Sequence, residues 1–494
     1  MKQKQKYSFK ERLAELRRAD EEFVYFIAFL FALSTGEVSA VDLVKTGETS
    51  GYGKYSRSFK DIYRLGIGWS FGLAKACEMI ATKISDASDP HKQLLVKLAQ
   101  VIRLGDELKG FFKDELAATI HNYSARYERN LESQKLFLEM FYTISSTTSF
   151  MIASNSIMAM LMGQNNAENI FLMSFVAVVV SLGSFVFIMH MIFPRDKLAV
   201  GNSEHARKYR MLLYGTIGMG VSIGMVLFMT KLVPLPIVVV VSIAPLFLPG
   251  IFARKLENNT QHLNDWYPSF VRHFGQIYTT VGSVGQALDA VLRSDFGPLS
   301  AQIISLKNRI KSRISPEIGF ELFSREAGTS IITSGNTILS NSLQKGADLN
   351  EVGNKVADIS SKLNELRAKR RQTSKTFETI VIVMHALTMA ILGLMSKLTE
   401  IFNTLLSTVS VSNQAITLSP INPEFMNAMM PIVIVALSTI NGFAIKVGQG
   451  GLYKTVWYYI ALLGVIGGIT MYGTTAALSD FLSNHILDIY QTPP

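Results

Sequence analysis

Seven long apolar segments limit what this chain can fold into. A helix needs about 20 mostly apolar residues to cross the roughly 30 Å hydrocarbon core of a bilayer. Charged residues form only 17% of the chain, against about 25% in soluble domains. Segments of spanning length occur at 141–162, 170–193, 211–230, 232–252, 377–396, 427–445 and 456–478. The sequence therefore predicts an all-α integral membrane protein with seven transmembrane helices.

Two apolar regions differ from ordinary spans. The segment 141–162 is rich in serine and threonine, so we expect it to pack against other helices. The run 23–33 is strongly apolar but has about half the length of a span, which predicts a buried core helix.

Lysines and arginines in the short loops predict the orientation, because they are retained on the cytoplasmic side. The loop 194–210 carries five of them and the loop 446–455 carries two. The loops predicted on the other side of the membrane carry at most one lysine or arginine each. These are 163–169, 231, 397–426 and the tail 479–494. This asymmetry places the N-terminus in the cytoplasm of a multi-pass protein of the cell membrane, and the C-terminus outside.

The charged residues gather in two segments that both read as helical. The predicted organisation is a cytoplasmic domain 1–136, a four-span region 137–253, a second cytoplasmic domain 254–376, a three-span region 377–478 and an external tail 479–494. Apolar residues recur at three- and four-residue spacing in both domains, which indicates helical bundles.

The two predicted domains share landmarks. Each has a turn with glycine after an aromatic helix, around Gly36 in the first domain and around Gly282 and Gly285 in the second. A later glycine, Gly105 or Gly346, then precedes a long charged helix that runs into a span. Matched landmarks at similar spacing predict a duplicated domain.

These landmarks resemble the type II secretion system F domain family, whose members are membrane platforms of type IV pilus and secretion machines. Four spans between two such domains and three after the second resemble the archaeal branch, which includes platforms of the archaellum and of adhesive pili. The resemblance implies a hexameric cytoplasmic secretion ATPase and pilin or archaellin subunits as partners, and filament assembly or rotation as the process. We also expect a homodimer.

Motifs for bond chemistry are missing from the sequence. The nearest string to a phosphate-binding loop, 47–56, has Tyr55 after Lys54 where serine or threonine is needed, and its glycine spacing is wrong. The histidines are scattered, and Cys77 is the one cysteine, so the sequence predicts no catalytic residue, cofactor or metal. His385 lies within the fifth span, where a hydrogen-bonded helix contact is favoured over a proton relay.

Basic residues form the candidate functional surface. A patch within the second domain and a run before the fifth span are predicted to dock an acidic ATPase or to face anionic lipid heads of the bilayer. These residues are Lys307, Arg309, Lys311, Arg313, Arg367, Lys369, Arg370, Arg371 and Lys375. The first domain offers Arg17, Arg18, Arg126 and Arg129. Interleaved aromatics are lacking, which disfavours a nucleic-acid partner.

Two glycine pairs at four-residue spacing are candidate helix-packing sites. Gly220 and Gly224 lie in the third span, and Gly464 and Gly468 lie in the seventh. Small residues at this spacing let helices approach closely, either within one chain or across a dimer.

The sequence leaves a competing interpretation open. Pro245 and Pro431 could kink two spans, as in a polytopic transporter or channel with regulatory cytoplasmic domains. A receptor or scaffold is a third option. Ordered architecture and family resemblance favour a membrane platform that is not an enzyme.

Overall fold

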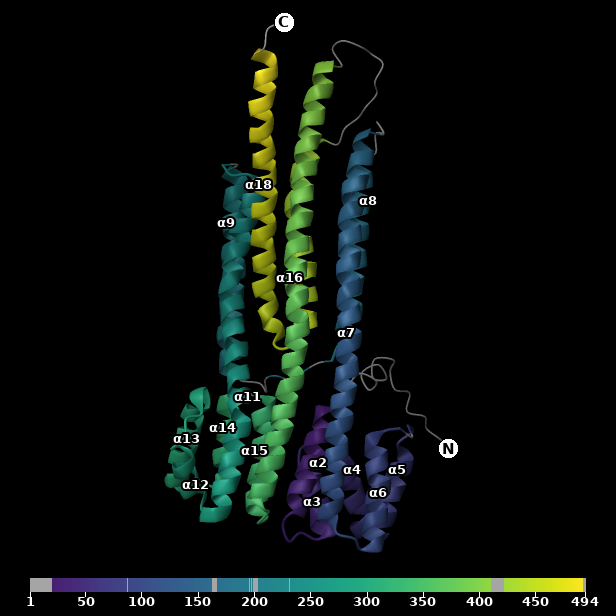
Figure 1. Ribbon diagram of the computed structural model, residues 1–494, viewed down its shortest axis with the longest axis vertical. Coiled ribbons are helices and arrows are strands. Elements are labelled where there is room, and N and C mark those ends of the chain that lie inside the picture. Colours follow the sequence, from purple (N-terminus) through teal and green to yellow (C-terminus); the bar gives the residue numbers. More distant parts are fainter. Residues whose placement is uncertain are drawn as a thin grey trace. The chain divides into compact units, whose positions relative to one another are not determined.

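The computed structural model describes residues 20–86, 88–161, 167–194, 196, 198, 203–230, 232–409 and 422–491. Every regular element within these ranges is a helix (Figure 1). Arg17, Arg18, Arg195, Lys197 and Lys231 lie outside the described residues.

The first stretch of chain contains α2 (Glu21–Ser34), α3 (Ala40–Thr49), α4 (Gly53–Tyr63), the π-helix η1 (Arg64–Gly68), α5 (Leu73–Lys83), α6 (Pro90–Leu104) and α7 (Leu108–Leu161). Next come α8 (Ala167–Ile192), α9 (Ser203–Thr230), α10 (Leu235–Ile243), η2 (Ala244–Leu246) and α11 (Phe247–Val281). The remainder contains α12 (Val284–Val291), η3 (Gly297–Leu299), α13 (Ser300–Lys311), α14 (Pro316–Ala327), α15 (Ser330–Gln344), α16 (Leu349–Val409), α17 (Pro423–Gln449), η4 (Tyr453–Thr455) and α18 (Val456–Gln491).

The chain divides into two compact units. We call the first the helical unit; it comprises Met1–Asn130, Asp196–Asn202 and Asn258–Ala368. We call the second the span unit; it comprises Leu131–Arg195, Ser203–Glu257 and Lys369–Pro494. Both charged segments that the sequence separates into domains therefore contribute to one unit.

Helix α2 explains why the two charged segments fold together. All its residues from Phe23 to Leu33 are buried, which confirms the expectation of a core helix. It packs against α15 of the second segment. At its end, Asp348 N donates to Thr35 Oγ1 at 3.2 Å, and Gly36 lies so close to the Lys345 carbonyl that a Cβ would be 2.8 Å from it. A helix that is apolar all round needs cover on every side.

Both segments place helices in the same order. The series α2 to α7 corresponds to the series α11 to α16, and α6 and α15 each have 15 residues. Gly105 and Gly346 follow these two helices with φ of 71° and 63°, the left-handed conformation that glycine adopts most easily. This order agrees with a duplicated domain, and duplication stays a prediction.

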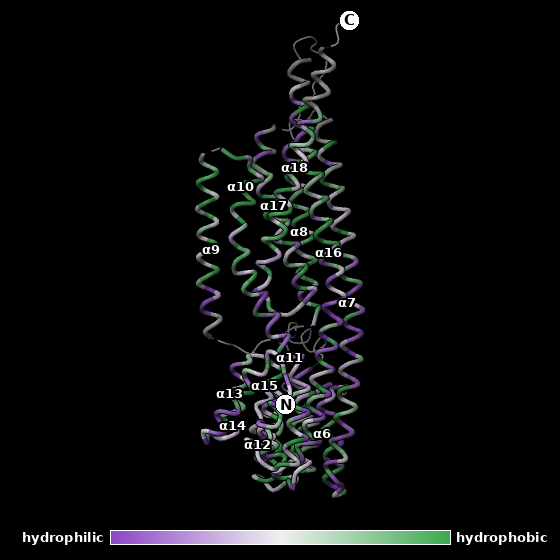
Figure 2. The backbone as a smooth tube through the Cα atoms, turned by 60° about the vertical axis from the view of Figure 1, so that its left-hand side comes forward, coloured by the Kyte–Doolittle hydropathy of each residue, from purple (hydrophilic) through white to green (hydrophobic). Residues whose placement is uncertain are grey.

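The span unit supplies the membrane helices. Six described helices are long and apolar enough to cross a bilayer: Glu168–Ile192, Arg207–Thr230, Leu235–Val281, Leu349–Thr404, Glu424–Gln449 and Tyr453–Phe481. Hydrophobic residues dominate α8, α9, α10 and α17 (Figure 2). The chain is therefore a multi-pass membrane protein.

The expected span at 141–162 is not among these six helices, so the count of seven stays a prediction. Helix α7 continues without a break to Leu161. Its polar residues Ser145 and Ser149 are buried, and Ser149 Oγ lies 2.7 Å from Thr388 Oγ1 of α16. This segment packs its hydroxyl groups against other helices.

Helix α10 lies against both glycine pairs. A Cβ on Gly220 would lie 2.3 Å from the Ser242 carbonyl oxygen, and one on Gly224 would lie 2.5 Å from Ser242 Oγ. From α18, Gly464 lies against Ile243 in the same way. Gly468 lies against Val240 and Pro236. The four glycines thus pack against helix α10 and its neighbours within one chain.

We expect Gly468→Val to destabilise the span unit. The added Cβ would lie 2.3 Å from Val240 Cγ2 and 2.9 Å from the Pro236 carbonyl oxygen. Overpacking of this kind costs about 1–3 kcal/mol. Gly473→Val on the same helix is the matched control, because no atom lies within 4 Å of its added Cβ. Thermal unfolding in detergent should show a lower midpoint for the first variant alone; equal midpoints would contradict the close packing.

Candidate functional site

The predicted basic run before the fifth span is divided between surface and interior. Arg367 and Arg370 are buried, with 5% and 2% of their surface exposed. Lys369 and Lys375 are exposed, and Arg371 is half-buried. The expectation that all five residues face lipid or a partner is therefore wrong for the two buried arginines. A buried guanidinium needs partners, and the structure supplies them.

Arg367 is held within the helical unit. Its Nη2 donates to both carboxylate oxygens of Glu21, at 2.9 and 3.1 Å, and the two side chains are 6% and 18% exposed. Ser330 Oγ, in the first turn of α15, lies 3.5 Å away. Glu21 belongs to the first turn of α2, so one ion pair connects the first and second charged segments.

The connection between α8 and α9 also reaches this part of the helical unit. Tyr127 of α7 donates a hydrogen bond to Asp196, with both carboxylate oxygens at 3.2 Å. The Leu198 carbonyl accepts from Ser330 N at 3.3 Å. Asp196 also interacts electrostatically with Arg367. The arginine therefore lies between two acidic residues from separate parts of the chain.

Arg370 is held within the span unit by backbone carbonyls. Its Nη1 donates to Pro194 O at 2.6 Å, Nη2 to Val447 O at 3.1 Å and Nε to Gly448 O at 3.2 Å. The last two carbonyls belong to the C-terminal turn of α17, where helix carbonyls lack intrahelical partners and carry partial negative charge. One side chain thus satisfies the end of α17 and the segment that follows α8.

Other buried polar groups surround Arg370. Gln134 of α7 donates to Gly448 O at 2.6 Å and to Ser374 Oγ at 3.2 Å. Lys446 Nζ pairs with Glu257 of α11 at 3.0 Å, with side chains 2% and 12% exposed. These contacts tie α7, α11, α16 and α17 together at the same place.

This polar layer lies at one end of the span unit and contacts α7, α11, α16, α17 and the segment that follows α8. Arg370 joins α16 to the end of α8 and the end of α17, and Gln134 and Glu257 add α7 and α11. Tyr209 of α9 donates to the Lys454 carbonyl, just before α18, at 3.1 Å. The loops 194–210 and 446–455, which the charge pattern assigns to one side, therefore share one end of the unit.

The basic patch of α13 is partly neutralised by neighbouring carboxylates. Lys307 and Lys311 both pair with Asp289, at 3.5 and 2.9 Å, and the hydrogen bond from Lys311 lowers the pKa of that carboxyl. Arg309 pairs with Glu326. Among the described residues, Arg313 has no ionic partner, and it is exposed. Arg126 and Arg129 are exposed on α7.

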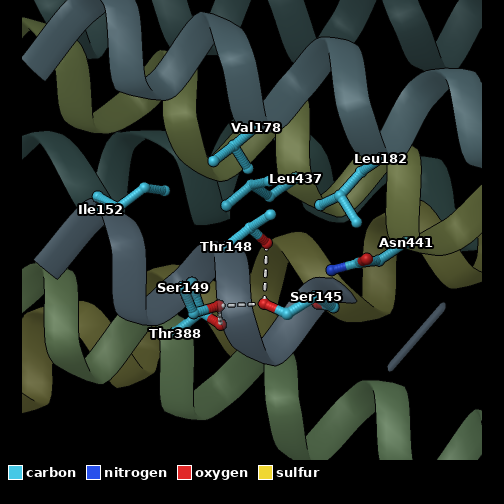
Figure 3. A pocket seen from close by; sticks show the side chains of 9 residues that line it. All are labelled: Ser145, Thr148, Ser149, Ile152, Val178, Leu182, Thr388, Leu437 and Asn441. Carbon is cyan, nitrogen blue, oxygen red and sulfur yellow. Dashed lines mark hydrogen bonds between the residues drawn. The ribbon is translucent and has the colours of Figure 1, made fainter. Parts of the chain in front are cut away.

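His385 makes a hydrogen-bonded network within the span unit. Its Nε2 lies 3.1 Å from the Leu463 carbonyl and 3.2 Å from Ser438 Oγ, and its Nδ1 lies 3.1 Å from Asn441 Nδ2. A small cavity beside Asn441 is lined by Ser145, Thr148 and Thr388 (Figure 3). It has room for about one water molecule.

Sequence reasoning missed the acidic partners of the buried cations. Glu21 is 346 residues from Arg367, and Glu257 is 189 residues from Lys446. No local spacing relates such residues. The sequence carries a weak signal for Glu257 and Lys446. Each lies just beyond the end of an apolar segment that the charge pattern assigns to the cytoplasmic side.

Two curated archaeal proteins are similar to this chain. Flagella accessory protein J of Methanococcus voltae is 22% identical over 500 residues, which covers 97% of this chain and 88% of the relative. Flagella accessory protein J of Methanocaldococcus jannaschii is 23% identical over 492 residues, which covers 95% of this chain and 86% of the relative. The chain is thus similar to archaeal flagella accessory protein J over nearly its whole length. The similarity confirms the resemblance to the archaeal platform branch.

No family model matches the chain, and no solved structure matches it.

Arg367→Met should destabilise the helical unit by about 3–5 kcal/mol, because it leaves Glu21 buried without its partner. The loss should shrink when Glu21→Gln is added, since the uncompensated charge is then removed. Arg325→Met is the control: its pair with Glu321 is exposed, at 73% and 60%, and such pairs contribute at most about 1 kcal/mol. Denaturant unfolding compares the wild type with Arg367→Met, Glu21→Gln, the variant that combines them, and Arg325→Met. Additive effects of the two substitutions would refute the buried pair.

Proposed function

We propose that this chain is the membrane platform of an archaeal filament machine, either an archaellum or an adhesive pilus. The helical unit receives a cytoplasmic hexameric secretion ATPase, and the span unit receives pilin or archaellin subunits that enter the filament. The chain itself performs no bond chemistry. The names of its relatives and the combination of a helical unit with membrane helices support this proposal.

Helix α16 is the observation that carries the proposal. It runs unbroken from Leu349 to Val409 and leaves the helical unit after Ala368. Arg367 fixes it to α2 before that point, and Arg370 fixes it to the ends of α17 and α8 directly after it. Residues three apart on a helix lie within one turn. A displacement of the helical unit would therefore act on the ends of membrane helices through one turn of α16.

The orientation follows from charge. The end of the span unit that holds Arg370 also holds the two basic loops, and basic loops remain in the cytoplasm. The helical unit, which continues from this end through α7, α11 and α16, is then cytoplasmic. The transporter or channel alternative gains no support from the cavity of Figure 3, which has room for about one water.

Insertion of two glycines between Ala368 and Lys369 should abolish filaments while leaving the protein in the membrane. Both arginines keep their partners, but the turn that joins them becomes flexible, since glycine weakens a helix interior. The same insertion between Arg293 and Ser294, in an exposed turn, is the control. Electron microscopy of complemented deletion cells counts filaments, and immunoblotting of membranes measures the protein. Normal filament numbers in the first variant would exclude transmission through α16.

Cysteine labelling tests the orientation. Glu424→Cys, at the exposed start of α17, should react with a membrane-impermeant maleimide in intact cells. Arg325→Cys, exposed on α14, should react only after the membrane is permeabilised. Cys77 is buried in both variants and serves as the internal background. Reaction of Arg325→Cys in intact cells would place the helical unit outside and reject the platform.

A further inference from the structure

A small polar cavity lies among the helices of the span unit. Its polar lining comes from three helices: Ser145, Thr148 and Ser149 of α7, Thr388 of α16 and Asn441 of α17. Figure 3 shows the amide group of Asn441 reaching toward Ser145 and Thr148. The cavity offers about 10 Å³ to the centre of a water molecule, which is about the space that a single water requires.

Asn441 contributes a buried acceptor to this lining. Its Nδ2 lies 3.1 Å from His385 Nδ1, and because an amide nitrogen can only donate, the imidazole nitrogen accepts. The amide oxygen, Oδ1, is buried and has no hydrogen-bond partner among the described residues. The whole side chain is buried, with 4% of Asn441 exposed. An unpaired acceptor in such surroundings is unfavourable, and most groups of this kind are satisfied by protein or by ordered water.

Ser145 contributes the matching donor. Its carbonyl accepts from Thr148 Oγ1 at 2.9 Å and from Ser149 Oγ at 2.8 Å, but its hydroxyl makes no hydrogen bond with the described residues. The Thr148 hydroxyl therefore already donates to its own helix, and Thr388 Oγ1 likewise donates to Met384 O at 2.7 Å. These two threonines have only acceptor lone pairs left. The lining thus combines a hydroxyl donor with several acceptors.

The remaining lining limits what can occupy the cavity. Apolar side chains complete its walls: Ile152 of α7, Val178 and Leu182 of α8, and Leu437 of α17. None of the lining residues is charged, so a cation held among membrane helices would lack a carboxylate partner. A water molecule can donate to Asn441 Oδ1 and to a threonine oxygen while it accepts from Ser145. A buried water typically makes about three such hydrogen bonds.

We infer that this cavity is a hydration site that holds one ordered water between Ser145 and Asn441. The water links α7 to α17, and Asn441 continues the link through His385 to the Leu463 carbonyl of α18, 3.1 Å from Nε2. This link gives a role to the serines and threonines that make 141–162 polar for a span. The inference is independent of the proposed function.

Cryo-electron microscopy of the full-length wild-type chain in lipid nanodiscs tests the site directly. A map that resolves ordered waters should show a density peak at hydrogen-bond distance, about 2.7–3.2 Å, from both Asn441 Oδ1 and Ser145 Oγ. A cavity without such a peak would overturn the inference, and so would a direct hydrogen bond between these two atoms. The measurement needs no substitution, so it does not depend on whether a variant folds.

Val178→Ile tests the energetic role of the water, because a hydrated and a dry cavity predict opposite results. Val178 is buried and lines the cavity, so the added methylene displaces the water and leaves Asn441 and Ser145 unpaired. The thermal unfolding midpoint should then fall by about 2 °C. Filling a dry cavity would instead bury more apolar surface and raise the midpoint. An unchanged or higher midpoint therefore contradicts the hydration site.

Val180→Ile is the matched control on the same helix. Val180 is 59% exposed, so the same added methylene should leave the midpoint unchanged.

The choice of salt distinguishes a water from a cation. Wild-type midpoints in sodium, potassium and choline chloride should each differ from those of Val178→Ile by the same amount, because a hydration site has no affinity for a particular cation. A ligand that binds only the folded state would raise the midpoint. Stabilisation by sodium or potassium that Val178→Ile abolishes would assign the cavity to a cation and overturn the inference.

Discussion

The structure depends on how a helix-rich chain satisfies buried cations at helix ends. Arg370 is almost fully buried, yet its three donor atoms each find a backbone carbonyl. Helix ends leave carbonyls without partners, and the dipole gives them partial negative charge. The guanidinium therefore satisfies several groups that burial would otherwise make unfavourable, and this single side chain fixes where α8 and α17 end relative to α16.

Much of the architecture was predictable because bilayer thickness sets a length that sequence displays directly. The apolar segments, the polar character of 141–162 and the buried helix at 23–33 all follow from counting apolar residues, and α2 confirms the last of these. Charge counting also grouped the loops 194–210 and 446–455, whose residues the structure brings to one end of the span unit. These inferences use only local composition.

The site was far less predictable, because its contacts join residues far apart in the chain. A run such as Arg367 to Lys375 looks uniformly basic, and helical periodicity alone does not say which face is buried. The structure buries Arg367 and Arg370 because Glu21 and the carbonyls near Gly448 lie on that side. The cover of α2 is of the same kind: it comes partly from α15 of the other segment, a contact that no local pattern encodes.

The two kinds of basic residue should respond differently to solution conditions. Arginine stays protonated at any physiological pH, and the backbone carbonyls that hold Arg370 do not titrate. Burial also removes this contact from salt screening. The exposed cations Lys311 and Arg313 have neither protection, since water and salt reach them. Under the proposed function, the contacts of Arg370 would stay constant across solution conditions, while a contact made by the exposed cations would be reversible. The sequence presents Arg370 and Arg313 alike as positive charge, although the first is buried and the second is exposed.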